Sequence, residues 1–425
     1  MTNPLIDRAA GRSRPGSPLR ILVVYGTRPE AVKMAPLVHA LQRSADFEPV
    51  VAVTGQHRAM LDQVNQVFGI TPDVDLDIHS PGQTLTEITA RTLAGITPVI
   101  EQVAPDAVTV QGDTTTTYAV ALAAFYAQVP VVHLEAGLRT HNLTSPFPEE
   151  LNRRQTTMLT DLHLAPTAAA RANLLAEDVS PEAIVVTGNT VIDALHQTLA
   201  GLPAYGDDEL ERRLSGDARV LLVTAHRRES WGEPMQRIGR ALARLARRYP
   251  DLLVVFPAHR NPLVREAILP HLDGLTNVVI TEPLPYGGFC RLLQRASIVL
   301  TDSGGVQEEA PGLGKPVLVL RETTERPEAV DAGTVRLIGT DEDAVVEAVC
   351  RLHDDPAAYA AMAHATNPYG DGRAARRSVE ALAHFFGRGE RPAEFDPARP
   401  ARIELPDEIT DLAGPASGQL ELLPA

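Results

Sequence analysis

LRILVVYGTRPE, residues 19–30, runs an apolar strand straight into a short turn that bears an arginine and a glutamate. ARVLLVTAHRRE, residues 218–229, repeats this arrangement in the second half of the chain. A helical pattern follows each of them, over residues 31–42 and 234–249. The repetition marks the beginning of a second domain.

Short apolar runs alternate with helical patterns after each of these two stretches. The runs occupy residues 48–54, 106–113, 129–135 and 183–189 in the first half and residues 252–259, 277–284, 296–302 and 315–320 in the second. This alternation is typical of parallel sheets that are covered by helices on both faces. We therefore predict an α/β fold of two Rossmann-like, doubly wound domains, over residues 20–200 and 201–366, joined by the polar stretch near residues 200–217.

The two ends of the chain differ from the part between them. Residues 1–19 are polar and lack the apolar stretch of a secretory signal, so we predict a disordered lead. NPYGDG and the amphipathic pattern after it, within residues 367–387, predict a loop and a helix that close the fold. Residues 388–425 are mostly proline, alanine, glutamate and aspartate, which predicts a disordered tail.

Composition excludes several classes of protein. The chain has 425 residues, of which 44% are hydrophobic, enough for two cores, and its formal net charge of -15 argues against a general nucleic-acid binder. No apolar run is long enough for a membrane helix. The two cysteines, Cys290 and Cys350, lack disulfide or zinc spacing, so we expect a cytoplasmic protein without a metal site.

Open α/β sheets bind ligands beyond the carboxyl ends of their strands, which draws attention to the turn after residues 296–302. There Ser303, Gly304 and Gly305 lead into a helix, whose free amides attract phosphate. The same turn also fits a plain helix cap by Asp302 or Ser303, and the residues leave both interpretations open. No GxGxxG follows the first strand of either half, so we expect no dinucleotide cofactor.

Several ionisable side chains follow other strands and are candidates for acid–base chemistry. They are Asp113, Glu135, Glu149, Glu150 and His226. Each also fits a structural role, as a helix cap, a first-turn acid or an ion-pair partner. Arg28 and Lys33 begin the first helix, where a basic residue opposes the helix dipole and suggests a bound anion, although ordinary surface charge is the alternative.

Longer strings carry a resemblance to a known family. They are GTRPEAVKMAPLV, TGQHRAMLDQV, GDTTTT, HLEAGLRT, FPEELNRR, GNTVIDAL, HRRESWG, TDSGGVQEEAPGLGKPVLVLRETTERPEA and NPYGDG. In this order, from Arg20 to Phe386, the series resembles that of the bacterial non-hydrolysing UDP-N-acetylglucosamine 2-epimerases. The resemblance implies a glycosyltransferase-B-like architecture with a nucleotide-sugar cleft between the domains, a homodimer, and no metal.

The resemblance also implies site residues, position by position. The family's catalytic residues fall on Asp113, Glu135, Glu149 and His226. Its nucleotide-binding positions fall on Arg28, Lys33, Phe289, Ser303, Gly304, Gly305, Glu309 and Arg326. Gln56 and His57 resemble part of a second site through which UDP-N-acetylglucosamine (UDP-GlcNAc) activates such enzymes.

Three places depart from the family pattern. Gln111 stands where many relatives have histidine, Leu284 stands where some have glutamine, and PAHRNP at residues 257–262 replaces PVHLNP or PVHMNP. We expect none of the three to touch a catalytic position.

The implied activity is the reversible conversion of UDP-GlcNAc into UDP-N-acetylmannosamine (UDP-ManNAc). It would proceed by elimination of UDP to 2-acetamidoglucal, followed by re-addition of UDP. Three alternatives share the fold: a hydrolysing epimerase that releases UDP and ManNAc, a glycosyltransferase, and a non-catalytic sensor of nucleotide sugars.

Overall fold

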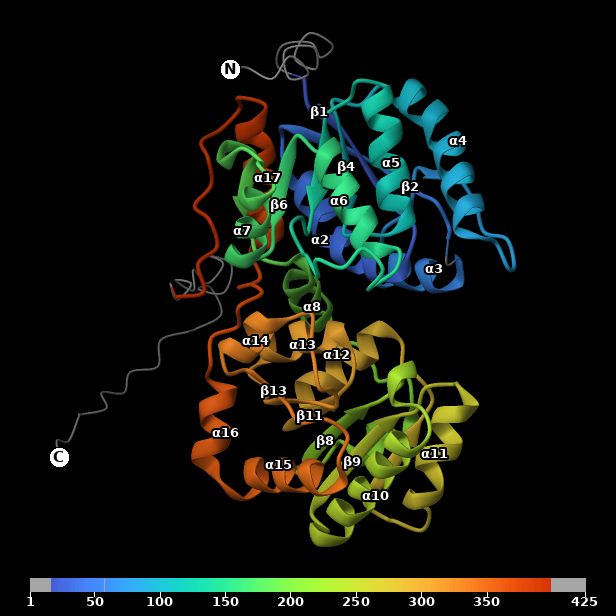
Figure 1. The fold of residues 1–425 in the computed structure, drawn as a ribbon, viewed down its shortest axis with the longest axis vertical. Coiled ribbons are helices and arrows are strands. Elements are labelled where there is room, and N and C mark those ends of the chain that lie inside the picture. The colour runs from blue at the N-terminus through green and yellow to red at the C-terminus, as the bar shows by residue number, and fades with distance from the viewer. Residues whose placement is uncertain (1–16, 57, 399–425) are drawn as a thin grey trace, which may run out of the picture.

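The computed structural model describes residues 17–56 and 58–398, which form two α/β units joined through helix α8 (Figure 1). The N-terminal unit holds a parallel sheet of seven strands in the order β3-β2-β1-β4-β5-β6-β7. Its strands are β1 (Leu19–Tyr25), β2 (Phe47–Val53), β3 (Val74–Asp75), β4 (Ala107–Gln111), β5 (Val131–Leu134), β6 (Leu162–Ala165) and β7 (Ile184–Val186). The order reverses between β1 and β4, which is where open sheets of this kind bind ligands.

The C-terminal unit holds a second parallel sheet, of six strands in the order β10-β9-β8-β11-β12-β13. Its strands are β8 (Arg219–Thr224), β9 (Leu252–Pro257), β10 (Val278–Thr281), β11 (Ile298–Thr301), β12 (Val317–Val319) and β13 (Val335–Leu337). Here the order reverses between β8 and β11. Two doubly wound domains were predicted from the alternation of apolar runs and helical patterns, and the structure confirms them.

Helices cover both faces of each sheet. Those of the first half are α2 (Arg28–Arg43), α3 (Arg58–Val67), α4 (Leu85–Val103), α5 (Thr115–Tyr126), α6 (Glu149–Leu159), α7 (Ala168–Ala176) and α8 (Thr190–Ala200). Those of the second half are α9 (Asp208–Arg213), α10 (Glu233–Arg248), α11 (Pro262–Leu272), α12 (Tyr286–Arg295), α13 (Gly304–Glu309), α14 (Pro327–Asp331), α15 (Glu342–Asp354), α16 (Pro356–Ala363) and α17 (Ala374–Phe385). Short 3-10 turns occupy Pro181–Ala183, Arg228–Ser230 and Ala310–Leu313. No helix of the described residues is both long and apolar enough to span a bilayer.

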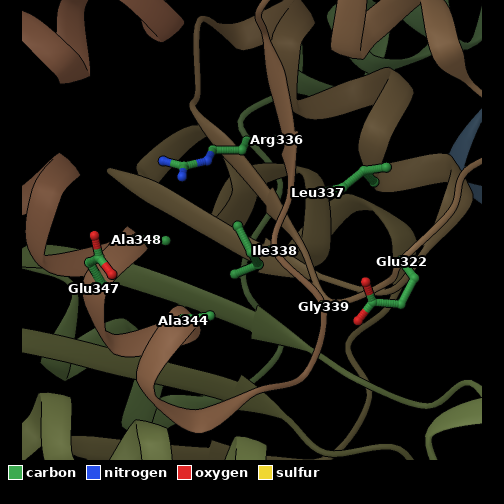
Figure 2. Close-up of a pocket in the computed structure, with 8 residues that line it drawn as sticks. All are labelled: Glu322, Arg336, Leu337, Ile338, Gly339, Ala344, Glu347 and Ala348. Atoms are coloured by element: carbon green, nitrogen blue, oxygen red, sulfur yellow. The ribbon is translucent and has the colours of Figure 1, made fainter.

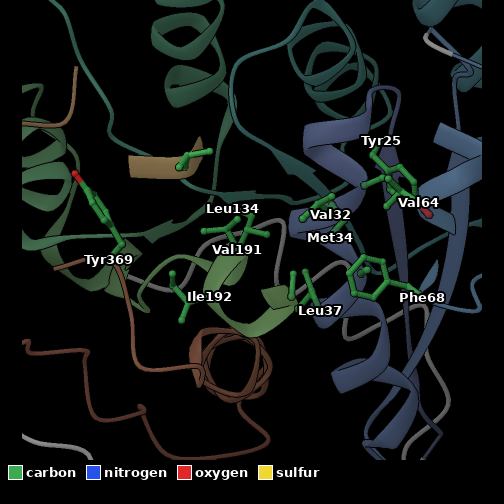
Figure 3. Packing of buried hydrophobic residues seen from close by; sticks show 14 of the residues in the cluster. Tyr25, Val32, Met34, Leu37, Val64, Phe68, Leu134, Val191, Ile192 and Tyr369 are labelled. Carbon is green, nitrogen blue, oxygen red and sulfur yellow. The ribbon is translucent and has the colours of Figure 1, made fainter. Parts of the chain in front are cut away.

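The central strands are buried along their whole length because helices shield both faces, as the continuous apolar runs predict. In the N-terminal core, Val64 of α3 lies beside Tyr25 of β1, and Leu37 of α2 and Phe68 belong to the same cluster (Figure 3). The Tyr25 hydroxyl donates to Asn65 Oδ1 at 2.9 Å, so its polar end is satisfied inside the core.

The chain returns to the N-terminal unit after the second sheet, because α17 packs against α2, α8 and β6 (Figure 1). The sequence ended the folded part at Gly387, but the packed chain continues to Ala398. Arg388 donates to the carbonyl oxygen of Ser17 at 2.9 Å, and the amide of Phe395 donates to Val186 O at 2.8 Å. The Phe395 contact joins the chain to the edge strand β7, and neither contact can be inferred from composition. Residues 1–16 and 399–425 of the predicted lead and tail lie outside the described residues.

Candidate active site

Two of the candidate carboxylates follow neighbouring strands of the N-terminal sheet. Asp113 follows β4 after Gly112, and Glu135 directly follows β5. Gly112 has φ +69°, and His133 Nε2 donates to its carbonyl oxygen at 2.7 Å, which fixes the turn before Asp113. Glu135 itself has φ +63°, a backbone conformation that is rare for a residue other than glycine and that clusters at functional sites.

The Glu135 carboxylate is held by three donors. Lys33 Nζ lies 2.5 Å from Oε1, Asn189 Nδ2 donates to the same oxygen at 2.9 Å, and Gln111 Nε2 donates to Oε2. Burial raises the pKa of Glu135, and the Lys33 ammonium opposes that rise. Contrary to expectation, Gln111 touches a candidate catalytic residue, because two adjacent parallel strands, β4 and β5, place it beside Glu135.

Helix α6 holds the second carboxylate. Arg153 Nη2 donates to Asp113 Oδ2 at 2.6 Å, and Asn152 Nδ2 donates to the Asp113 carbonyl oxygen at 3.0 Å. Burial raises the pKa of Asp113, the Arg153 guanidinium opposes that rise, and the charge of Glu149 adds to it. Glu149 is the first residue of α6 and is half-buried. Glu150 is fully buried and accepts hydrogen bonds from backbone amides instead, which gives it a structural role.

A buried ion-pair cluster links these carboxylates to the C-terminal unit. Glu308 of α13 accepts a hydrogen bond from Arg326 Nε at 2.6 Å and from Asn189 Nδ2 at 3.3 Å, and it lies 3.8 Å from Lys33 Nζ. Burial alone would raise the pKa of Glu308, but Arg326 and Lys33 hold it below its usual range. Glu135 and Glu308 therefore raise the pKa of Lys33 despite its burial. The cluster contains one basic residue from each unit.

Three residues of the candidate site, Arg153, Asn189 and Glu308, were missed as candidates. Asn189 comes soon after a strand, and Glu308 directly precedes Glu309, so the strand-end rule and the family string already pointed near both. Nothing local distinguishes Arg153 from Arg154 beside it.

The glycine turn after β11 begins α13. Ser303 occupies the N-cap position, but its side chain makes no capping hydrogen bond. Asp302 does not cap the helix either, because its carboxylate accepts the backbone amides of His226 and Arg227 at 2.6 and 2.7 Å. A Cβ at Gly304 would lie 2.7 Å from Arg326 Nη1, so a larger residue here would displace the Arg326 guanidinium. The plain-cap interpretation therefore loses both of its capping side chains.

His226 lies on the C-terminal side of the site, after β8. Its Nδ1 is 2.9 Å from Asp302 Oδ1, and its ring stacks on that of His259 at 5.5 Å between centroids. Burial alone would raise the pKa of Asp302, but the contacts with His226 hold this pKa below its usual range. This pairing directs Nδ1 toward the protein and leaves Nε2 as the nitrogen for a ligand.

The remaining nucleotide-site candidates surround Glu309. The Tyr286 hydroxyl donates to Glu309 Oε1 at 3.1 Å, and burial raises the pKa of Glu309 to about 7. Phe289 and Leu284 are half-buried and pack against the hydrophobic core that also contains Tyr25. Arg28 is exposed at the start of α2, and its charge acts on Glu309 across the boundary between the units.

Two other features lie away from this cluster. Gln56 accepts a hydrogen bond from Thr116 at 3.2 Å, and His57 lies outside the described residues. A cavity of about 380 Å³ opens beside β13 and α15 in the C-terminal unit (Figure 2). Its lining includes Glu322, Arg336 and Glu347 but none of the candidate site residues. Among residues 17–56 and 58–398, no group of three acidic, histidine or cysteine side chains is arranged to hold a metal ion.

Comparison with known proteins supplies the family. The model of the UDP-N-acetylglucosamine 2-epimerase family matches residues 39–383. The UDP-N-acetylglucosamine 2-epimerase of Escherichia coli K12 is 53% identical over 371 residues, which cover 86% of this chain and 98% of the relative. The chain belongs to the UDP-N-acetylglucosamine 2-epimerase family. Family membership assigns it that epimerase activity.

Solved structures agree with the family assignment. The UDP-GlcNAc 2-epimerase of Neisseria meningitidis, solved with UDP-GlcNAc bound, is 47% identical with a TM-score of 0.77, and the match covers 86% of this chain and all of that one. The glycosyltransferase SnogD of Streptomyces nogalater is only 19% identical, with a TM-score of 0.59 over 87% of this chain and 100% of that one, and shows the fold alone. The glycosyltransferase-B-like architecture predicted for this epimerase is confirmed.

Proposed function

We propose that this epimerase is of the non-hydrolysing kind and interconverts UDP-GlcNAc and UDP-ManNAc. One observation carries the proposal: Asp113 and Glu135 follow adjacent strands, each bound to its own cation, and a basic residue of the C-terminal unit, Arg326, joins the same cluster. Such a site offers two separate proton carriers and cationic groups for a diphosphate.

The chemistry explains why both kinds of group are needed. The C2–H bond of the sugar is not adjacent to a carbonyl group, so its deprotonation alone would give a poorly stabilised carbanion. In the proposed elimination, a base removes the C2 proton while the C1–O bond to UDP breaks, and the electron pair forms a C1–C2 double bond. Re-addition returns a proton to the opposite face of C2 and UDP to C1, without net hydrolysis or redox change.

The departing diphosphate develops negative charge that several groups can stabilise. Lys33 and Arg326 pair with carboxylates, and Arg28 is exposed at the start of α2. Gly304 and Gly305 begin α13, where the first amides of a helix have no partner within it. His226 offers its Nε2 atom. By resemblance, Ser303 joins the diphosphate site, Glu309 accepts the ribose hydroxyls and Phe289 lines the uracil pocket.

The proton carriers are Asp113, Glu135 and Glu149. Arg153 binds the Asp113 carboxylate, while Lys33 and Asn189 bind that of Glu135. Glu149 stands at the start of the helix that binds Asp113. Contacts of Glu308 with Lys33 and Asn189 tie the two units together beside these groups, which supports retention of the glycal and UDP between the two half-reactions.

Proton NMR of the purified protein with UDP-GlcNAc in D2O tests the proposal. We expect deuteration at C2 and an approach to equilibrium between the two UDP-sugars, without stoichiometric UDP. Accumulation of UDP and free ManNAc would instead establish the hydrolysing reaction. UDP release that requires an acceptor would establish a glycosyltransferase.

We further propose a homodimer that forms through the outer ends of α5 and α6. Three exposed large side chains lie there: Phe125 at 53%, Tyr126 at 68% and Met158 at 85% exposure. The two helices pack side by side, and we infer that these residues together form an apolar patch of a kind that marks interfaces. Analytical ultracentrifugation should show a dimer that Tyr126→Glu dissociates, whereas Leu202→Glu, an exposed site in the other half, should leave it intact.

We also propose activation by UDP-GlcNAc at a second site that includes Gln56 and His57. With UDP-ManNAc as substrate, traces of UDP-GlcNAc should raise the initial rate. A hyperbolic rate curve that these traces leave unchanged would count against the second site.

A further inference from the structure

The Asp113 carboxylate is hydrogen-bonded through one of its two oxygens. Arg153 Nη2 donates to Oδ2 at 2.6 Å, and Asn152 fixes the backbone carbonyl of the same residue at 3.0 Å. Among the contacts of the described residues, Oδ1 has no donor. Asp113 therefore presents one oxygen to a buried guanidinium and keeps the other for a ligand.

Arg153 is itself held rigidly in its place. Only 8% of it is exposed, and its Nη1 lies 3.4 Å from Glu150 Oε2. Glu150 is fully buried and accepts the amides of Thr140 at 2.9 Å and of His141 at 3.1 Å, so its carboxylate cannot move with the arginine. A different Arg153 rotamer would leave Glu150 buried without its counter-charge, which is strongly unfavourable.

The charges that face Asp113 come from three elements. Arg153 and Glu149 lie on α6, Lys33 lies on α2, and Glu135 follows β5. Lys33 is already bound to Glu135 at 2.5 Å. Arg153 is thus the cation in direct contact with Asp113, and without it the carboxylate would face Glu149 and Glu135 with little compensation.

We propose that Arg153 is a positioning residue that keeps Asp113 ionised and directs its free oxygen, Oδ1, toward the C2 proton. Glu150 acts one step further back, because it holds Arg153 in the orientation that this contact requires. The inference rests on the proposed elimination chemistry and adds to it the group that makes Asp113 a base.

The test compares Arg153→Gln and Arg153→Lys with Arg154→Gln, a matched control on the same helix. Arg154 is 45% exposed, and its Nε is 3.6 Å from Glu177, away from Asp113. The readout is kcat/KM for C2 deuteration between pH 5 and 9. Arg153→Gln should move the acidic limb upward by about one pH unit or more and recover activity at high pH, since an adjacent opposite charge lowers a carboxyl pKa by about that amount. Arg153→Lys should move it less, and Arg154→Gln should not move it.

If Arg153→Gln lowers activity equally at every pH, the inference is wrong and Arg153 has only a structural role. Selective 13C labelling of aspartate carboxyl groups, with Asp113→Asn to assign the signal, follows the same titration without turnover. Its midpoint should also rise in Arg153→Gln, or in Arg153→Lys if the glutamine variant does not fold. A wild-type protein that shows no C2 exchange would instead refute the proposed function, and an unshifted carboxyl titration would refute the role of Arg153.

Discussion

Replacing Asn189 by serine should separate the two tasks of this side chain. Its Oδ1 accepts the Val191 amide at 3.0 Å and so caps α8, while its Nδ2 donates to Glu135 at 2.9 Å and to Glu308 at 3.3 Å. Serine is as good an N-cap as asparagine, but its hydroxyl is too short to reach both carboxylates. The substitution therefore removes the donor that bridges the two units and keeps the helix cap.

The expected cost follows from the geometry. A hydrogen bond to a charged group contributes about 1.5–3 kcal/mol, and the 3.3 Å bond to Glu308 belongs at or below the lower limit. Glu135 retains Lys33 and Gln111, and Glu308 retains Arg326, so neither carboxylate is left unpaired. We expect Asn189→Ser to lower the free energy of unfolding by about 2–3 kcal/mol.

Asn261→Ser is the matched control, because Asn261 caps α11 through the Leu263 amide at 3.0 Å, and within the described residues its side chain is not hydrogen-bonded to the carboxylate cluster. It should change stability by less than about 0.5 kcal/mol. Urea unfolding followed by circular dichroism, under identical conditions for both variants, measures the difference. Equal destabilisation by the two substitutions would refute the bridging role of Asn189.

Three further predictions follow from other contacts. Burial raises the pKa of Glu309 from 4.5 to about 7, so the folded state retains a proton that the unfolded chain releases, and the contribution of Glu309 to stability should fall as pH rises from 4.5 to 7. In urea unfolding over this pH range, Glu309→Gln should therefore show a smaller fall in stability than the unaltered protein, and an equal fall would contradict the raised pKa. Phe395→Ala should lower the free energy of unfolding, measured by calorimetry, by about 3 kcal/mol or more, because Phe395 is only 7% exposed. Leu202→Ala, at a residue that is 76% exposed, should leave it almost unchanged, and similar values for the two variants would show that the C-terminal segment contributes little to stability. Gln111→Met removes a donor to Glu135 and should lower kcat about tenfold or more without unfolding the protein, and an unchanged kcat would contradict this role.

Much of the architecture was predictable from local patterns. The apolar runs that follow each other at short intervals predicted strands that the structure contains, because burial on both faces of a parallel sheet excludes polar residues from them. The return of the chain beyond Gly387 was not predictable in this way. The Phe395 amide donates to the carbonyl oxygen of Val186, which is 209 positions earlier. This contact depends on β7 being the last strand of its sheet.

The candidate site was likewise predictable only in part from the sequence. The sequence by itself determined that Asp113 and Glu135 meet at one sheet edge, because parallel strands end on the same side and the residue after each strand is a local matter. Only the tertiary structure decided which partner each carboxylate has: Arg153 is 40 residues from Asp113, and Asn189 is 119 residues from Glu308. Strand and helix patterns act over a few residues, whereas these ion pairs depend on how whole elements pack and on the rotamers that the packing allows.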